Sequence, residues 1–215
     1  MTSMSDHIQR ENERLLSCFR KEGVQIRILN KKDGYQKWWE KAAMWLVRLF
    51  NRSVDDFITV FFDGQEARIY WSASGSFRDW SINDHAVFRH ECVHVLQAMR
   101  ISRSRLGALL FSLAYLFLLP AVWTMRAKFE REAYTESART LLQYGVAPRD
   151  LDKTMDRWAR YFYGSDYLFM DPISGGGFRP GKSLRQSILN GELSPLNGPL
   201  REIGFTPNLP PKETR

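Results

Sequence analysis

The sequence predicts an α+β fold in which a small antiparallel sheet or hairpin packs on several helices. Residues 57–62 and 67–71 are short runs rich in β-branched and aromatic residues, and the Asp-Gly pair between them is typical of a hairpin turn. Apolar residues recur at helical spacing in residues 35–50 and again in residues 88–99. A chain of 215 residues, 44% of them hydrophobic, is long enough for one domain with a buried core.

The chain before the hairpin, residues 1–50, is predicted to be a helical N-terminal extension. Residues 5–20 have the composition of a polar helix capped by Ser5, and residues 24–29 alternate as a strand does. In residues 35–50 an aromatic-rich stripe at helical spacing predicts a helix that packs against the core through this stripe. The stripe consists of Trp38, Trp39, Ala42, Trp45, Leu46 and Leu49.

The residues that carry chemistry lie in the helix expected after the hairpin, for which the segment Ser81-Ile82-Asn83-Asp84 offers N-terminal caps. The segment His90-Glu91-x-x-His94 places two histidines four residues apart, one turn above the other on one side of the helix. Their imidazoles can take two corners of a tetrahedral zinc site, and Glu91 projects beside them to hold a water. The opposite face is apolar and is expected to anchor the helix to the core through Phe88, Cys92, Leu96 and Met99.

This motif resembles that of the zincin metallopeptidases. The later segment, residues 129–134, resembles the Glu-x-x-Ala segment that gives gluzincins their third ligand, and its glutamate in that place is Glu130. Over roughly residues 55–170 the chain is similar to small zinc peptidases of bacteria and tailed phages.

The resemblance implies a zincin-like metal-binding core at residues 51–170, in which an active-site helix packs on the small sheet. It also implies one zinc ion per chain, held by His90, His94 and Glu130. In many gluzincins the residue four positions after the ligand glutamate is an aspartate that braces a zinc-bound histidine. Tyr134 stands at that position here.

Two neighbouring glutamates are candidates for the third ligand. Around Glu130, helical spacing places alanines and other residues that let a second helix approach closely, and a carboxylate buried there needs a metal or another cation. Glu132 shares its face with charged residues, which predicts a solvated face. We therefore expect Glu130 to be the ligand, and the alternative is that it forms an ion pair with Arg126 or Arg131. The charged neighbours of Glu132 are Lys128, Glu136 and Arg139.

Residues 106–119 are almost wholly apolar and end at Pro120. A helix that spans a bilayer needs about 20 apolar residues, which is more than this run offers. A single span would also leave Glu130 on the opposite side of the membrane from His90. We therefore expect a buried core helix here, with membrane attachment as the alternative.

The last part of the chain, residues 171–215, is rich in proline and glycine and is predicted to be an extended arm. We expect the arm either to wrap the domain or to bind a protein partner. The net charge of +7 permits contact with acidic partners, but no dense Lys/Arg block supports specific nucleic-acid binding. Because Cys18 and Cys92 are the only cysteines and the N-terminus has no apolar signal region, we expect a cytoplasmic protein without disulfides.

These residues together predict a zinc-dependent metallopeptidase that acts on a peptide or protein substrate, with Glu91 as the general base. Tyr134, Tyr163 and Tyr167 are candidates to stabilise an oxyanion. No role is assigned to His85, which we expect at the surface or as a cap. The alternative function is a non-catalytic structural or assembly protein, for example of a phage particle, that retains a zincin fold.

Overall fold

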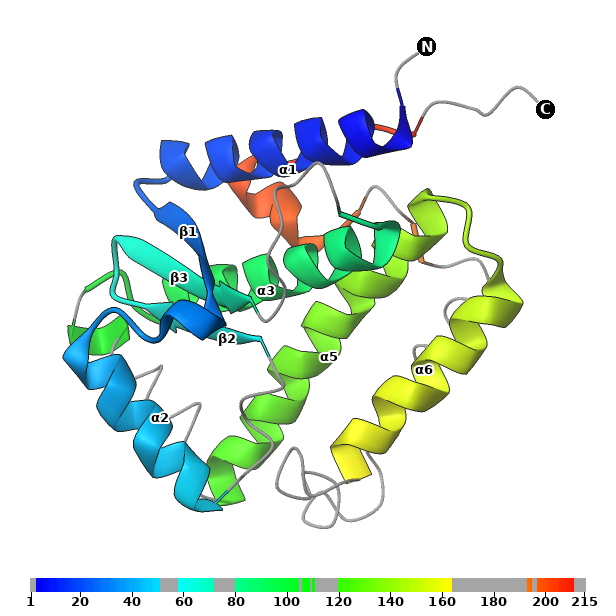
Figure 1. Ribbon diagram of the computed structural model, residues 1–215. Coiled ribbons are helices and arrows are strands. Elements are labelled where there is room, and N and C mark those ends of the chain that lie inside the picture. The colour runs from blue at the N-terminus through cyan, green and yellow to red at the C-terminus, as the bar shows by residue number, and fades with distance from the viewer. Residues whose placement is uncertain are drawn as a thin grey trace.

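In the structure of the protein, a computed structural model, a three-stranded sheet lies against helix α3, and α3 lies along a second long helix, α5 (Figure 1). Helix α1 covers the outer side of α3, and helices α2 and α6 lie at the periphery. The fold is therefore α+β, as the sequence predicts. The residues that the structure describes are 3–50, 58–71, 80–104, 106–108, 110, 120–163, 193–194 and 197–210.

The sheet contains β1 (Gln25–Asn30), β2 (Thr59–Phe62) and β3 (Glu66–Trp71) in the order β1-β3-β2. β2 and β3 form the predicted antiparallel hairpin, and Gly64 lies in its turn with φ of 92°, a conformation that favours glycine. β1 pairs with β3 in parallel, so the sheet is mixed and the prediction of an antiparallel sheet holds only for the hairpin. The cause is a helix in the connection from β1 to the hairpin, because such a crossover lets strands run in the same direction.

Helices α3 (Ile82–Ile101) and α5 (Pro120–Gln143) pack along one another and carry the candidate site, and α6 (Pro148–Tyr163) follows α5. The cap of α3 is a pair of reciprocal hydrogen bonds. The Asp84 amide donates to the Ser81 hydroxyl (3.2 Å), and the Ser81 amide donates to the Asp84 carboxylate (2.9 Å). The prediction that the segment 81–84 caps this helix is confirmed, and Ser81 is the capping residue.

Helix α1 (Met4–Lys21) is capped by Ser3 rather than by the predicted Ser5. Ser3 is the better cap because Asp6 follows three residues later, and the two residues form the same reciprocal bonds as at the start of α3. α1, the sheet, α3 and the short 3-10 helix η5 (Pro199–Ile203) share one core cluster. Its side chains include Ile8, Leu15, Phe19, Ile69, Phe88, Val95, Leu200 and Phe205.

The segment 197–210 is held between α1 and α5. Glu11 on α1 accepts hydrogen bonds from the backbone amide (3.0 Å) and the side-chain amide (2.8 Å) of Asn208. Gln143 on α5 donates to the Asn208 carbonyl at 2.5 Å. The described part of the expected arm is thus packed on the domain. The predicted domain boundaries and an additional protein partner stay predictions.

Helix α2 (Trp38–Phe50), which follows the 3-10 helix η1 (Lys31–Asp33), is oriented by a buried polar cluster. The Glu40 carboxylate forms an ion pair with the Arg68 guanidinium, and both side chains are fully buried. The Tyr70 hydroxyl donates to the other oxygen of Glu40 at 2.6 Å. α2 therefore turns its acidic residue, and not its aromatic stripe, toward the sheet.

The prediction that the aromatic-rich stripe of α2 packs against the core is wrong for most of the described stripe residues. Trp38 is 80% exposed and Trp45 is 63% exposed, whereas Ala43 and Met44 are buried. Of the described stripe residues, only Trp39 makes a ring contact with the core, edge-on to Phe61 with centroids 5.3 Å apart.

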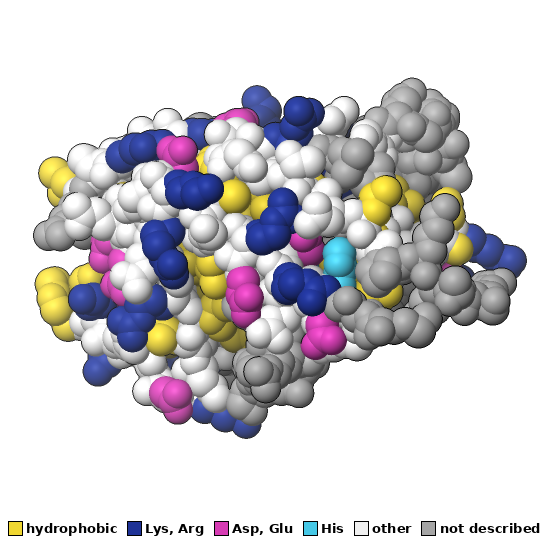
Figure 2. Space-filling view, turned by 90° about the horizontal axis from the view of Figure 1, so that it is seen from above, with side chains coloured by type: hydrophobic (Ala, Val, Ile, Leu, Met, Phe, Trp, Pro, Cys, Tyr) yellow, Lys and Arg dark blue, Asp and Glu magenta, His cyan; other side chains and the backbone are white. Residues whose placement is uncertain are grey.

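Most of the predicted core helix at residues 106–119 lies outside the described residues. Within it, Ala108 is buried, but Leu106 and Leu110 are exposed. None of the helices among the residues that the structure describes is long and apolar enough to cross a bilayer. On the face that Figure 2 shows, Lys and Arg side chains are interspersed with Asp and Glu side chains and with apolar groups.

We expect Glu40→Gln to lower the free energy of unfolding by about 3 kcal/mol, because the buried Arg68 loses its main counter-ion and keeps only Asp63 and Glu66. The measurement is urea unfolding followed by circular dichroism. The matched control is Lys153→Gln in an exposed ion pair, for which a change below about 1 kcal/mol is expected. Equal effects of the two changes would contradict the role of this cluster.

Candidate metal centre

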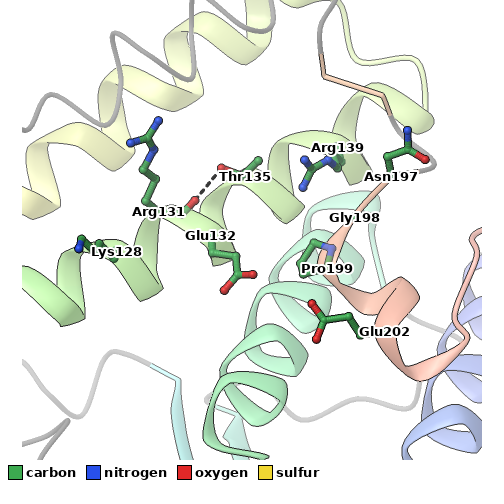
Figure 3. Close-up of a pocket in the computed structure, with 9 residues that line it drawn as sticks. All are labelled: Lys128, Arg131, Glu132, Thr135, Arg139, Asn197, Gly198, Pro199 and Glu202. Atoms are coloured by element: carbon green, nitrogen blue, oxygen red, sulfur yellow. Dashed lines mark hydrogen bonds between the residues drawn. The ribbon is translucent and has the colours of Figure 1, made fainter. Parts of the chain in front are cut away.

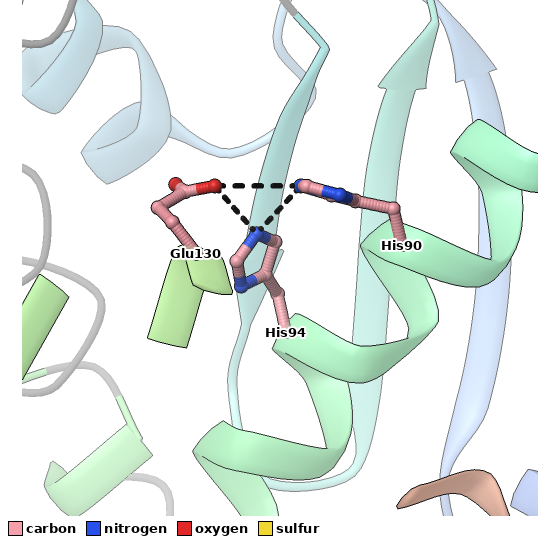
Figure 4. A group of neighbouring side chains, drawn as sticks. All are labelled: His90, His94 and Glu130. Atoms are coloured by element: carbon pink, nitrogen blue, oxygen red, sulfur yellow. Dashed lines mark hydrogen bonds and ion pairs between the residues drawn. The ribbon is translucent and has the colours of Figure 1, made fainter. Parts of the chain in front are cut away.

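Two histidines of α3 and one glutamate of α5 point toward one another (Figure 4). The Nε2 atoms of His90 and His94 are 3.1 Å apart. The Oε2 atom of Glu130 lies 3.4 Å from Nε2 of His90 and 3.6 Å from Nε2 of His94. The structure thus brings together the three residues that the sequence predicts as ligands.

The triangle of these three atoms has the size that a tetrahedral metal site requires. Ligand atoms about 2.0–2.1 Å from a zinc ion lie roughly 3.3–3.4 Å apart at the corners of a tetrahedron. The observed separations of 3.1, 3.4 and 3.6 Å lie on either side of this value. A buried His-His-Glu group of these dimensions can hold a metal ion, and the described residues contain no second group of this kind.

The rest of α3 fixes the direction of the two imidazoles. Its opposite face is buried in the main core through Phe88, Cys92, Leu96 and Met99, as predicted. Because side chains four residues apart share one side of a helix, anchoring this face turns both histidines toward α5.

Gln97 orients the imidazole of His94. Its side-chain oxygen lies 2.9 Å from Nδ1 of His94, and its side-chain nitrogen donates to the Phe129 carbonyl (2.9 Å) and to Glu132 (2.8 Å). These two donated bonds assign the amide, so its oxygen must accept from Nδ1–H. In neutral His94, Nε2 then carries the lone pair, which is the state that a metal ligand needs.

A serine takes the corresponding place at His90. The Ser137 hydroxyl donates to the Ala86 carbonyl (3.1 Å) and lies 3.5 Å from Nδ1 of His90, at the limit of a hydrogen bond. The Tyr134 ring lies edge-on to the His90 ring, with centroids 4.6 Å apart. Ser137 and Tyr134 therefore both contact the His90 ring from α5.

The electrostatics of the centre favour a cation. Burial opposes ionisation of both partners, yet the Glu130 carboxylate raises the pKa of His94 to about 9, and His94 and His90 hold the pKa of Glu130 well below its usual range. Burial raises the pKa of Glu91, against the opposing effect of both histidines and of Lys31. The ionised carboxylate of Glu130 thus attracts positive charge to the centre, and Glu91, whose pKa is raised, lies beside it.

Arg89, next to His90 in the chain, fixes α5 against α3. Its Nε donates to Glu136 at 2.9 Å and its Nη1 donates to Gln143 at 2.8 Å, and all three side chains are buried. The prediction that Glu136 lies on a solvated face is therefore wrong, because Arg89 on the neighbouring helix binds this carboxylate in the interior.

Glu132 lies outside the centre, as expected for a partly solvated carboxylate. It forms an ion pair with Arg100 at 2.8 Å, and Arg100 also binds Glu202. Both glutamates line a cavity of about 420 Å³ between α5 and residues 197–202 (Figure 3). The cavity also exposes Lys128 and Arg139, but none of the three candidate metal ligands lines it.

The remaining residues singled out from the sequence are His85, Tyr163 and Tyr167. His85 is fully buried and its Nδ1 lies 2.6 Å from the Asn12 side-chain oxygen, so the expectation of a surface or capping histidine is wrong. The Tyr163 side chain and Tyr167 lie outside the described residues. The sequence interpretation missed Gln97 and Ser137, although a residue three positions after His94 on the same helix could have been found from helical spacing.

No protein-family model matches this chain, and neither a curated protein nor a solved structure matches it.

We expect Glu130→Gln to weaken metal binding by more than about 100-fold, because an anionic ligand is removed from a buried site. Glu132→Gln is expected to weaken it by roughly ten-fold or less, since Glu132 acts only through Gln97. Titration of both variants with a competing chelator measures the contrast. A larger loss in Glu132→Gln than in Glu130→Gln would show that the ligand assignment is wrong.

We expect Gln97→Leu to weaken metal binding roughly 10–100-fold, because His94 loses the acceptor that fixes its tautomer. The same chelator titration measures this loss, and circular dichroism checks that the fold is kept. Gln9→Leu, on the outer side of α1, is the matched control and should leave metal binding unchanged. An unchanged metal affinity of Gln97→Leu would show that Gln97 does not contribute to metal binding.

Proposed function

We propose that the protein is a zinc-dependent metallopeptidase of zincin type. The observation that carries the proposal is a buried carboxylate, Glu91, on the same helix turn as two imidazoles whose Nε2 atoms face Glu130. Two imidazoles and one carboxylate are a typical ligand set of catalytic zinc, and three protein ligands leave a fourth position open.

A bound zinc ion would supply a Lewis acid that polarises a scissile carbonyl and lowers the pKa of a water. Glu91 would accept the proton of such a water and pass it to the leaving amine. Burial raises the pKa of Glu91, which favours proton uptake by this carboxylate.

The surroundings of the centre support peptide hydrolysis as the chemistry. Gln97 accepts from Nδ1–H of His94, so neutral His94 presents Nε2 to a metal, and Ser137 lies 3.5 Å from Nδ1 of His90. Tyr134 contacts the ring of His90, with centroids 4.6 Å apart, so we assign it as the candidate oxyanion stabiliser. The hairpin packed on α3 is a further feature that zincins share.

The variant Glu91→Gln separates this function from a purely structural role of the metal. We expect it to keep about one zinc per chain and to lose at least roughly 100-fold in peptide hydrolysis, because the general base is removed while the ligands remain. Elemental analysis measures the zinc, and mass spectrometry of a digested peptide library measures the hydrolysis.

Glu13→Gln, on the exposed side of α1, is the control and should keep both zinc and activity. If the zinc-loaded wild type cleaves no peptide, the function is structural or assembly-related and the metal serves stability. If Glu91→Gln cleaves as fast as the wild type, Glu91 is not the base.

A further inference from the structure

The outward face of α2 has the composition of a membrane-interfacial helix. Trp38 and Trp45 are 80% and 63% exposed. Because they are seven residues apart, they lie within about 20° of each other around the helix axis. Leu46, 37% exposed, and the exposed Ala42 lie on the same side. Single exposed apolar residues are ordinary, but two tryptophans on one stripe form a patch that requires an explanation.

The exposure of this patch follows from the way α2 is anchored. Glu40, about 160° away from Trp38 around the axis, is held in the interior by Arg68 and Tyr70. Ala43 and Met44 are buried on that same side. The helix cannot turn its tryptophans inward without exposing this side and breaking the buried ion pair, so the aromatic face stays outside.

Cations flank the patch. Lys41 lies about 60° from Trp38 around the axis, and the exposed Lys37 and Arg48 lie toward the same flank. The one acidic residue of α2 is the buried Glu40, so this helix offers no exposed negative charge. Figure 1 shows α2 at the periphery, on the opposite side of the sheet from α1.

We propose that the outer face of α2 binds the surface of an anionic lipid membrane. The tryptophan rings insert at the level of the lipid headgroups, and the lysines contact the headgroup charges. A second copy of the chain fits the face less well, because a two-fold contact would bring the basic flanks of two α2 helices together without an acidic residue on either one.

The experiment is co-sedimentation of the full chain with vesicles of phosphatidylcholine alone and of phosphatidylcholine mixed with phosphatidylglycerol. We expect binding to the vesicles that contain phosphatidylglycerol and little binding to the others. The double variant Trp38→Ser/Trp45→Ser should bind at least roughly ten-fold more weakly, because two exposed rings no longer leave water. Circular dichroism establishes that this variant is folded.

A charge variant tests the flank separately. Lys37→Gln/Lys41→Gln should weaken binding by roughly five-fold for each cation removed. The matched control, Arg149→Gln/Lys153→Gln on α6, removes the same charge from another exposed helix and should bind as the wild type does. No sedimentation with either vesicle, or equal binding of all variants, would overturn the proposal. A concentration-dependent dimer in analytical ultracentrifugation that the tryptophan variant abolishes, without vesicle binding, would assign the face to a second copy.

Discussion

The geometry of the candidate metal centre depends on the buried contact of Arg89 with Glu136. Arg89 adjoins His90 on α3, and Glu136 lies six residues, about 9 Å, along α5 from Glu130. A shift of α5 by one turn, about 5.4 Å, would move Glu130 out of reach of the histidines. The side chain of Phe205 covers the guanidinium of Arg89 at 5.4 Å, which shields the contact from solvent. The histidines alone therefore do not make the site, since the register of two helices completes it.

Local sequence patterns were sufficient for the parts of the structure that short-range geometry determines. Four-residue spacing put His90 and His94 on one side of α3, and the Asp-Gly pair gave the hairpin turn. The neighbours of Glu130 predicted a position close to a second helix, and its carboxylate does face α3. Each of these predictions needed only the period of a helix or the turn chemistry of a hairpin.

Features that depend on distant partners could not be predicted in this way. The parallel pairing of β1 depends on a crossover through α2, and the burial of His85 depends on Asn12, 73 residues away. The stripe of α2 was apolar enough to be core, but the Glu40 contact with Arg68 decided which side faces inward. A buried ion pair with a distant residue can decide which face of a helix is buried, even against the hydrophobic periodicity of that helix. The local sequence does not show which distant residue is the partner.

The contact between Glu11 and Asn208, which are 197 positions apart, also has a consequence for the order of events during synthesis. During synthesis, His90, His94 and Glu130 leave the ribosome before Leu200, Ile203 and Phe205. These three later residues belong to the core cluster that α3 shares. The nascent chain therefore carries all its predicted metal ligands while the surface under η5 is still open to water. Contacts between such distant residues are slow to form, because a long loop must close first. Metal uptake before chain release would join α3 to α5 early and leave the closing of the core as the last step of folding.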